Sequence, residues 1–240
     1  MNILAFDTCF SACSAAVSSG PAGGIVSERL FLDTGHAEAL LPMIERVMRA
    51  AGLAFADLDR IVVANGPGTF TGVRTGVAAA RALALATRAE VVAVSSLWAL
   101  AQAGLALRPL PPDNALLVAM DARKSEVYAQ AFDASGASLC PPQVLTPELA
   151  AMLLPDKPMA IIGNAASAVA DAASRAGRET TLISPDADAT LSTIAPDARF
   201  LLTATCVRAP GEQRSAVRPI YLRAPDAKPQ SDKSLPWSKL

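Results

Sequence analysis

The sequence predicts an α/β protein with two similar lobes, and three features of the chain support this class. Each half of the 240 residues opens with an apolar run that ends in an aspartate, Asp7 in the first half and Asp121 in the second. A polar turn, a returning strand and a glycine-containing turn follow in both halves. Strand and helix patterns then alternate, which is typical of a mixed sheet with helices on its faces.

The first half contains five runs that predict strands, at residues 2–7, 15–18, 25–32, 60–65 and 91–94. Apolar residues at helical spacing predict three helices, at about 35–51, 73–88 and 95–107. We expect Thr34 to cap the first helix, and Pro42 to kink it or delay its start. Ser95 or Ser96 is expected to cap the third helix. A glycine-rich loop at 66–72 precedes the second helix.

The second half repeats this order after a proline-rich stretch at 109–112. Because such a stretch cannot continue a helix or a central strand, we expect an N-terminal lobe at 1–108 and a C-terminal lobe at 109–223. Strands are predicted at 115–120, 126–132, 138–144, 160–162 and 181–183. Helices are predicted at 147–154, 165–176 and 191–207. The tail at 224–240 has little periodicity and is expected to be mobile.

The order of elements is thus the same in both halves: three strands, a helix, a strand, a helix, a strand and a helix. An aspartate closes the first strand each time. This repeated order predicts a duplicated actin-like fold, the ribonuclease-H-like architecture shared by actin, Hsp70 and sugar kinases. A fold of this kind hosts many activities, so it does not by itself indicate a function.

Charge and composition exclude several classes of function. The chain has 21 basic and 22 acidic residues and a net charge of −1. Proteins that bind nucleic acid alone usually carry a basic excess, so any role with RNA is expected to need a partner that supplies positive surface. No apolar run reaches the roughly 20 residues of a membrane helix, and no signal peptide is recognisable. We therefore expect a cytoplasmic protein without a membrane partner.

Cysteine and histidine usage gives no support for a metal site. The cysteines are Cys9, Cys13, Cys140 and Cys206, and no Cys-x-x-Cys pair occurs. The only histidine is His36, which is expected to cap a helix or lie on the surface. Zinc sites need several such ligands at short spacing, so we predict neither a metal centre nor a disulfide. No nucleophile can be paired with a histidine, and no catalytic residue is assigned.

The two strand-closing aspartates are candidates for a site between the lobes. An aspartate followed by a tight polar turn, as in Asp7-Thr8, can cradle phosphates or hold Mg²⁺ through water. Asp121 is the equivalent candidate in the second half. The alternative is that each aspartate caps its own turn. At Asp121 the neighbouring Arg123 favours this structural role.

Five blocks of residues resemble the bacterial TsaB family. The most diagnostic is the glycine-rich loop with the start of its helix, Gly66-Pro67-Gly68-Thr69-Phe70-Thr71-Gly72-Val73-Arg74. The others are Ile3-Leu4-Ala5-Phe6-Asp7-Thr8 with Ala12-Cys13-Ser14, His36 with Leu41-Pro42-Met43-Ile44, Asp121-Ala122-Arg123 with Glu126-Val127-Tyr128, and Pro219-Ile220-Tyr221-Leu222-Arg223. Together they span residues 3–223. Ser125 departs from the family, whose members often carry glycine there.

The resemblance implies a role in making threonylcarbamoyladenosine on tRNA, at the adenosine just 3′ of the anticodon. It implies that the catalytic, metal-binding subunit is a TsaD-type paralogue and that a TsaE-type ATPase joins the two. The chain itself would be a non-catalytic subunit that activates the TsaD-type partner and can also form a homodimer. No cofactor is expected to bind it stably, because ATP is used by the partner ATPase. The tRNA is expected to bind only through the complex.

The helix after the glycine-rich loop is the expected docking element. It carries a stripe of small residues, Gly72, Gly76 and Ala80, which would let another helix approach closely. The alternative is that this stripe packs inside its own lobe. Since the resemblance implies pairing through N-terminal helices, we expect a partner surface formed by His36, Leu40, Met43, Gly72, Val73, Gly76, Val77 and Ala80.

Two other functions stay open at this point. An autonomous phosphotransferase could use Asp7 and Asp121 in the cleft between the lobes, as sugar kinases do, with Gly163-Asn164 as a loop on the adenosine side. A metallopeptidase is the other alternative. The single histidine argues against it, because the usual histidine-rich site needs a second one.

Overall fold

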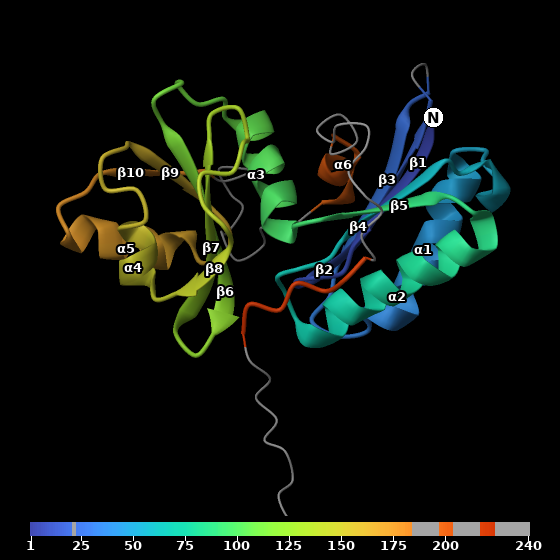
Figure 1. The fold of residues 1–240 in the computed structure, drawn as a ribbon, viewed down its shortest axis with the longest axis horizontal. Coiled ribbons are helices and arrows are strands. Elements are labelled where there is room, and N and C mark those ends of the chain that lie inside the picture. Colours follow the sequence, from blue (N-terminus) through green and yellow to red (C-terminus); the bar gives the residue numbers. More distant parts are fainter. Residues whose placement is uncertain (21–22, 184–196, 204–216, 224–240) are drawn as a thin grey trace, which may run out of the picture.

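The computed structural model describes residues 1–20, 23–183, 197–203 and 217–223 and shows two lobes (Figure 1). The N-terminal lobe contains β1 (Asn2–Asp7), β2 (Ala12–Ser19), β3 (Ile25–Phe31), β4 (Arg60–Ala64) and β5 (Glu90–Val94). The C-terminal lobe contains β6 (Ala115–Arg123), β7 (Glu126–Asp133), β8 (Gln143–Leu145), β9 (Met159–Ile162) and β10 (Thr180–Leu182). The helices are α1 (His36–Ala50), α2 (Phe70–Thr87), α3 (Ser96–Leu107), α4 (Pro147–Ala151), α5 (Ala166–Arg175) and α6 (Ala198–Leu201).

The two sheets have equivalent strand orders, which confirms the predicted duplication. The first sheet has the order β3-β2-β1-β4-β5, and the second has β8-β7-β6-β9-β10 when it is followed from its hairpin edge. In both, the first strand pairs antiparallel with the second and parallel with the fourth. The apolar runs that form β1 and β6 are buried almost throughout, as expected for central strands of sheets with helices on both faces. The duplicated two-lobed α/β fold is therefore confirmed.

Helix α1 differs from its prediction at the N-terminus. Its N-cap is Gly35, whose φ of 86° lies in the left-handed region, and no side chain caps the helix. The predicted cap at Thr34 is therefore wrong. The helix also runs through Pro42 without a later start. Pro42 and Glu38, whose carbonyl loses its usual amide donor, are both exposed, so water can satisfy the backbone there.

Two elements of the C-terminal lobe are shorter than predicted. The strand predicted at 138–144 is observed as β8 only at Gln143–Leu145. Pro141 and Pro142 precede β8 and have no N–H group to donate to a ladder. Helix α4 ends at Ala151, three residues before the predicted end. Of the helix predicted at 191–207, the described part contains α6. The remainder of that helix, Cys206 and the tail at 224–240 lie outside the described residues.

The last helix of each lobe packs against the sheet of the other lobe. Helix α3 follows the N-terminal sheet in the chain, yet its Gly104 lies against Ile162 and Leu116 of the C-terminal sheet. Helix α6 packs on the N-terminal sheet, where the Ala198 N–H donates to Ser14 Oγ at 3.1 Å. Figure 1 shows both helices between the lobes. The lobe boundary between residues 108 and 109 stays a prediction. Helices α3 and α6 each pack on the sheet that lies on the other side of this boundary.

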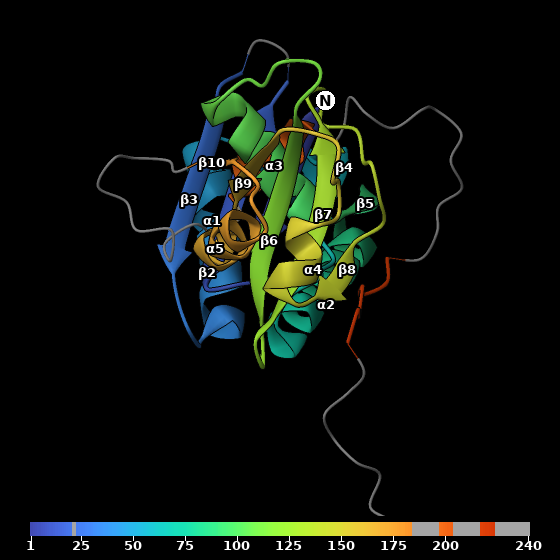
Figure 2. The same ribbon diagram turned by 90° about the vertical axis from the view of Figure 1, so that its left-hand side faces the viewer.

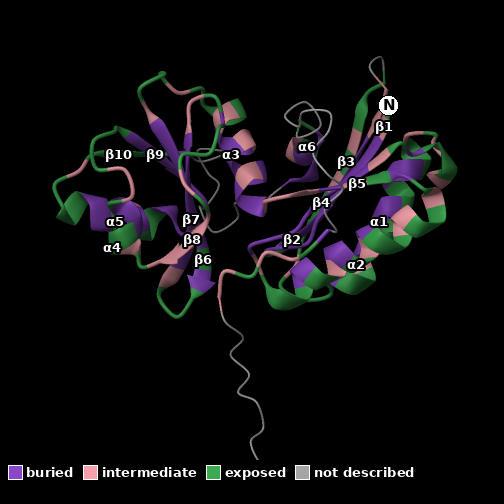
Figure 3. Cartoon of the chain, in the orientation of Figure 1, coloured by how far each residue is buried: buried purple, intermediate pink, exposed green. Residues whose placement is uncertain are grey.

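The buried side chains form one cluster between the lobes and one on the outer side of each sheet. Helices α1 and α2 present buried residues to the N-terminal sheet and exposed residues to solvent (Figure 3). Helices α4 and α5 cover the outer face of the C-terminal sheet in the same way (Figure 2). Within the described part of the chain, no helix combines the length and apolarity required to span a membrane.

Candidate functional site

Asp7 lies at the end of β1 and is almost fully buried, with an exposed fraction of 2%. Its Oδ1 accepts a hydrogen bond from the backbone N–H of Cys9 at 2.7 Å. Among the described residues, no group donates a hydrogen bond to its Oδ2. Burial is the main cause that raises the pKa of Asp7 to about 6. This is the geometry of an aspartate that caps its own turn, the alternative left open by the sequence.

Thr8 holds the start of α2 against the end of β1. Its Oγ1 donates a hydrogen bond to the carbonyl of Gly72 at 2.7 Å. A Cβ atom added at Gly72 would lie 1.9 Å from the carbonyl oxygen of Thr8. One added at Gly76 would lie 2.8 Å from Thr8 Oγ1. Only glycine permits this approach, so these two positions serve packing within the lobe.

The glycine-rich loop is also held inside the lobe. The N–H of Thr69 donates to the carbonyl of Cys9 at 2.7 Å. The Thr69 side chain is the N-cap of α2, where it accepts from the Gly72 N–H at 3.2 Å. This cap starts the helix at Phe70, three residues earlier than predicted. These backbone donors therefore position the loop on the Asp7 turn and do not point at an anion.

Asp121 is exposed, unlike Asp7. Its Oδ1 accepts from the backbone N–H of Arg123 at 2.7 Å, and its own N–H donates to Asn164 Oδ1 at 2.7 Å. Asp121 and Asn164 help to line a pocket of about 380 Å³ together with Ser125 and Glu126. Every residue that lines this pocket belongs to the C-terminal lobe. The pocket therefore does not bring Asp7 and Asp121 together.

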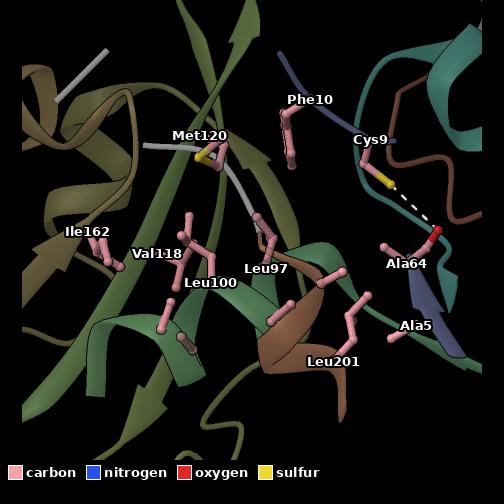
Figure 4. Packing of buried hydrophobic residues seen from close by; sticks show 14 of the residues in the cluster. Ala5, Cys9, Phe10, Ala64, Leu97, Leu100, Val118, Met120, Ile162 and Leu201 are labelled. Atoms are coloured by element: carbon pink, nitrogen blue, oxygen red, sulfur yellow. Dashed lines mark hydrogen bonds between the residues drawn. The ribbon is translucent and has the colours of Figure 1, made fainter. Parts of the chain in front are cut away.

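Side chains from both lobes fill the region between the two aspartates. Phe10 follows the Asp7 turn and is 6% exposed. Its ring lies edge-on to that of Tyr128 in the C-terminal lobe, with centroids 6.3 Å apart. Figure 4 shows Phe10 and Met120 in the cluster between the lobes. The predicted cleft is thus occupied here by an apolar core.

The eight residues predicted to form a partner surface are buried inside the N-terminal lobe. They are His36, Leu40, Met43, Gly72, Val73, Gly76, Val77 and Ala80. His36 neither caps α1 nor lies on the surface, because its Nε2 is 2.8 Å from the carbonyl oxygen of Phe10. The small stripe on α2 allows the helix to approach its own sheet. The prediction that these side chains form a partner surface is therefore wrong, because they pack inside the N-terminal lobe.

The outer faces of α1 and α2 carry residues other than these eight. Leu41 on α1 is 51% exposed, and Leu85 on α2 is 87% exposed. Ala78 and Ala82 are also exposed on α2, and Thr75 is half-buried. Helix α2 has no acidic residue, and its charged residues are Arg74 and Arg81. Arg74 donates to the Tyr221 hydroxyl and Arg81 to the carbonyl of Val217, which directs both side chains to residues 217–223.

The segment 217–223 is a strap that joins the two lobes (Figure 1). At its start, the Ile220 N–H donates to the carbonyl of Asn65 at 2.7 Å, and Asn65 Nδ2 donates to the carbonyl of Arg218 at 2.8 Å. At its end, Arg223 Nη1 donates to the carbonyl of Ala122 at 2.8 Å. The sequence marked this segment as a motif but gave no sign of its partners, which lie far away in the chain.

The β6–β7 hairpin closes through three residues with left-handed backbones. Arg123, Lys124 and Ser125 have φ values of 64°, 52° and 61°. Arg123 pairs with Glu126, so Lys124-Ser125 is a two-residue loop with positive φ at both positions, as a type I′ turn requires. Such a loop favours Asn-Gly, and Ser125 stands where the resemblance leads us to expect glycine.

Replacing Ser125 by glycine is therefore expected to raise the free energy of unfolding by about 1 kcal/mol, since glycine adopts positive φ without the Cβ clash. Urea unfolding followed by circular dichroism measures the change. Ser11→Gly is the matched control, because Ser11 is exposed and its φ is not in the left-handed region. An equal gain in both variants would contradict this explanation.

Metal-ligating side chains do not gather in the part of the chain that the structure describes. No group of three or more His, Cys, Asp or Glu residues there could hold a metal ion. Cys9, Cys13 and Cys140 are free thiols, and the first two are buried. Burial raises the pKa of Cys13 to about 11 and that of Cys9 well above its usual range. Neither thiol is therefore activated as a nucleophile.

Comparison with known proteins gives a consistent set of relatives. A family model described as "TsaD: tRNA N6-adenosine threonylcarbamoyltransferase" matches residues 13–195. The chain is 34% identical over 128 residues to the tRNA threonylcarbamoyladenosine biosynthesis protein TsaB of Escherichia coli K12, which covers 53% of each protein. It is 35% identical over 128 residues to the Haemophilus influenzae protein of the same name, covering 53% of this chain and 52% of that one. The chain thus spans about half the length of the curated relatives that it matches.

Solved structures extend the similarity over most of the chain. A structure described as YeaZ from Pseudomonas aeruginosa superposes with a TM-score of 0.75 and 28% identity, covering 92% of this chain and 99% of that one. A second structure from the same organism, described as similar to peptidase YEAZ, has the same TM-score and coverage at 29% identity. The matched region includes both lobes.

Proposed function

Because the chain belongs to the TsaD family of tRNA N6-adenosine threonylcarbamoyltransferases and is of the TsaB/YeaZ type, we propose that it is a non-catalytic partner subunit in threonylcarbamoyladenosine formation. Its role is to bind and activate a TsaD-type catalytic subunit that modifies the adenosine just 3′ of the tRNA anticodon. A TsaE-type ATPase is the proposed third component and the user of ATP. Self-association is the proposed state when the catalytic subunit is absent.

The observation that carries this proposal is the exposed outer face of α2. Its residues Thr75, Ala78, Ala82 and Leu85 form a row at helical spacing, and none of them is charged. Small residues let a second helix approach closely, and Leu85, with 87% exposure, provides an apolar side chain to bury. Arg74 and Arg81 flank this row, and both donate to the segment 217–223. The row itself therefore offers a strip of small and apolar residues that fits another helix better than it fits water.

Leu85→Glu is therefore expected to weaken association with the TsaD-type partner about tenfold, because it places a charge in an apolar contact. Isothermal calorimetry with the purified partner measures the affinity. Leu149→Glu is the matched control, since Leu149 is also an exposed leucine on a helix (58%) but lies on α4 of the other lobe. If both variants bound like the wild type, α2 would not be the docking helix.

Omission assays test the role of the chain in the reaction. The TsaD-type subunit, the ATPase and this chain are mixed with tRNA, and each is left out in turn. We expect modified adenosine only when this chain is present. Modification at full rate without it would contradict the activating role.

The phosphotransferase alternative is not favoured. The contact between Phe10 and Tyr128 and the buried position of Asp7 leave that aspartate no access to a nucleotide between the lobes. Titration of the isolated chain with ATP distinguishes the two functions. Saturable binding with turnover would support a kinase, whereas a subunit that leaves ATP to its partner would show none.

A further inference from the structure

Exposed aromatic and basic side chains lie along the strap 217–223, from its crossing with α2 to its contact with the β6–β7 hairpin. We call this set the strap patch, and its members are Phe70, Arg74, Arg123, Arg218 and Tyr221. Phe70 is 52% exposed and Tyr221 is 47% exposed. All three arginines are exposed. Arg74 lies one helical turn before Ala78, so the patch adjoins the α2 face proposed for the protein partner.

The aromatic part of the patch is held in place by Arg74. Its guanidinium carbon lies 3.7 Å from the centroid of the Phe70 ring, and its Nε donates to the Tyr221 hydroxyl at 2.9 Å. The Phe70 and Tyr221 rings are stacked, with centroids 5.6 Å apart and planes 28° apart. Two planar side chains are thus fixed in orientation while each residue stays about half exposed. Ordering them in advance lowers the entropy that a ligand must overcome.

Basic residues dominate the charge around these rings, although Glu126 forms an ion pair with Arg223 at 3.3 Å and the exposed Asp121 accepts from the Arg123 N–H. Residues 70–87 and 217–223 carry four arginines and no acidic residue, although the whole chain has a net charge of −1. Within the described residues, no carboxylate forms an ion pair with Arg74, Arg123 or Arg218. The Arg223 contact with the carbonyl of Ala122 brings the β6–β7 hairpin, and with it Arg123, to the end of the strap.

Exposed rings beside unpaired arginines match the chemistry of single-stranded RNA. Bases stack on aromatic rings, and arginine binds the flanking phosphates. A protein partner would need acidic groups and apolar side chains in alternation, whereas RNA supplies a uniform negative charge and a planar base at every nucleotide. The excess of arginines over acidic residues therefore favours RNA.

We propose that the strap patch binds a single-stranded segment of RNA, with a base stacked on Tyr221 and phosphates held by Arg218 and Arg123. This rests on the proposed function, because it gives a subunit of a tRNA-modifying complex its own contact with RNA. It also replaces the expectation, drawn from net charge, that RNA binds only through partner subunits. Net charge hides a basic surface when acidic residues lie elsewhere on the chain.

The test uses the isolated full-length chain and a short unstructured RNA, with fluorescence anisotropy at low ionic strength. Tyr221→Leu removes the ring and is expected to weaken RNA binding about tenfold, since stacking contributes about 1–3 kcal/mol per base. Tyr221→Phe keeps the ring and loses only the hydroxyl, so its affinity should stay close to that of the wild type. Equal losses in both variants would show that Tyr221 only anchors the strap and would overturn the proposal.

The charged part of the patch has its own test. The double variant Arg123→Gln, Arg218→Gln is expected to bind RNA about tenfold more weakly and to lower the magnitude of the slope of log affinity against log salt by about 1.4. Arg49→Gln on α1 is the matched control, because Arg49 is an exposed arginine far from the strap in sequence. Absence of RNA binding by the wild-type chain, or equal binding by the double variant and the control, would overturn the proposal.

A separate measurement keeps this inference distinct from the proposed function. Association of the same variants with the TsaD-type partner is followed by calorimetry. If the wild-type chain bound RNA but not the partner, the proposed function would fail and the strap patch would stand. If the patch variants lost the partner but kept their affinity for RNA, the patch would be a protein-docking surface and the inference would fail.

Discussion

Gly72→Ala is expected to lower the free energy of unfolding by about 3 kcal/mol, near the upper end of what overpacking usually costs. The added Cβ would lie 1.9 Å from the carbonyl oxygen of Thr8 and 2.7 Å from Thr69 Oγ1. The first of these atoms is backbone of the residue that follows the central strand β1, and it cannot rotate away. Helix α2 would have to move off the sheet, and the Thr8–Gly72 hydrogen bond would be lost with it.

Urea unfolding of the variant and the wild type measures this effect. Gly24→Ala is the matched control, because a Cβ at Gly24 would meet no atom within 4 Å and its φ is not in the left-handed region. The control should unfold like the wild type. If Gly72→Ala were as stable as the control, α2 would not be held against β1 as described.

Gly76 shows how this packing changes the meaning of the small stripe. If the stripe formed a partner surface, a bulky residue at Gly76 would disturb pairing and leave the single chain folded. The structure places Val63 Cγ2 3.4 Å and Thr8 Oγ1 2.8 Å from a Cβ at this position. A leucine there would therefore disturb the lobe itself, and weaker pairing would follow as a consequence of unfolding.

The sequence could not distinguish these two roles, because small residues at a spacing of four serve any close approach of a helix. The pattern shows which face of α2 carries small side chains. It does not show whether a sheet or a second helix packs against that face. The exposed row that ends at Leu85 has no comparable periodic signal, because alanines dominate the whole helix. The burial of each residue in the folded lobe shows that the small stripe packs on the sheet and that the row ending at Leu85 faces solvent.

The fold itself was predictable because it depends on local patterns. Continuous apolar runs that end at Asp7 and Asp121 identify the central strands, and their repetition identifies the duplication. The contacts of the strap are different, since Ile220 bonds to Asn65 and Arg223 to Ala122 across more than a hundred residues. No local rule predicts such pairings. The strap patch was for this reason invisible in the sequence.

Asp7 is expected to make the protein less stable as the pH rises from about 4 to about 6. Burial, the largest cause, raises the pKa of Asp7 from 3.8 to about 6, and Asp197 raises it further. The Cys9 hydrogen bonds and the charge of His36 act in the opposite direction. The folded state therefore binds a proton more tightly than the unfolded state does. A shift of about two units corresponds to about 3 kcal/mol of unfolding free energy.

The sign of this effect is opposite to that of a salt-bridged carboxylate. Between the two pKa values, the folded chain keeps the Asp7 proton and the unfolded chain releases it, so each rise in pH favours unfolding. The contribution of Asp7 to stability is full below pH 4, falls through the window and is lost above pH 6. Ionisation of Asp7 at neutral pH leaves a buried carboxylate with one hydrogen bond at Oδ1 and none from the described residues at Oδ2.

Asp7→Asn separates this titration from that of every other group. The amide oxygen can still accept the Cys9 N–H, and the side chain carries no charge at any pH. The difference in unfolding free energy between variant and wild type should therefore shift in favour of the variant by about 3 kcal/mol from pH 4 to pH 7. Urea unfolding at a series of pH values measures it. A difference that stayed constant with pH would mean that Asp7 titrates normally, and that the turn after β1 opens to solvent.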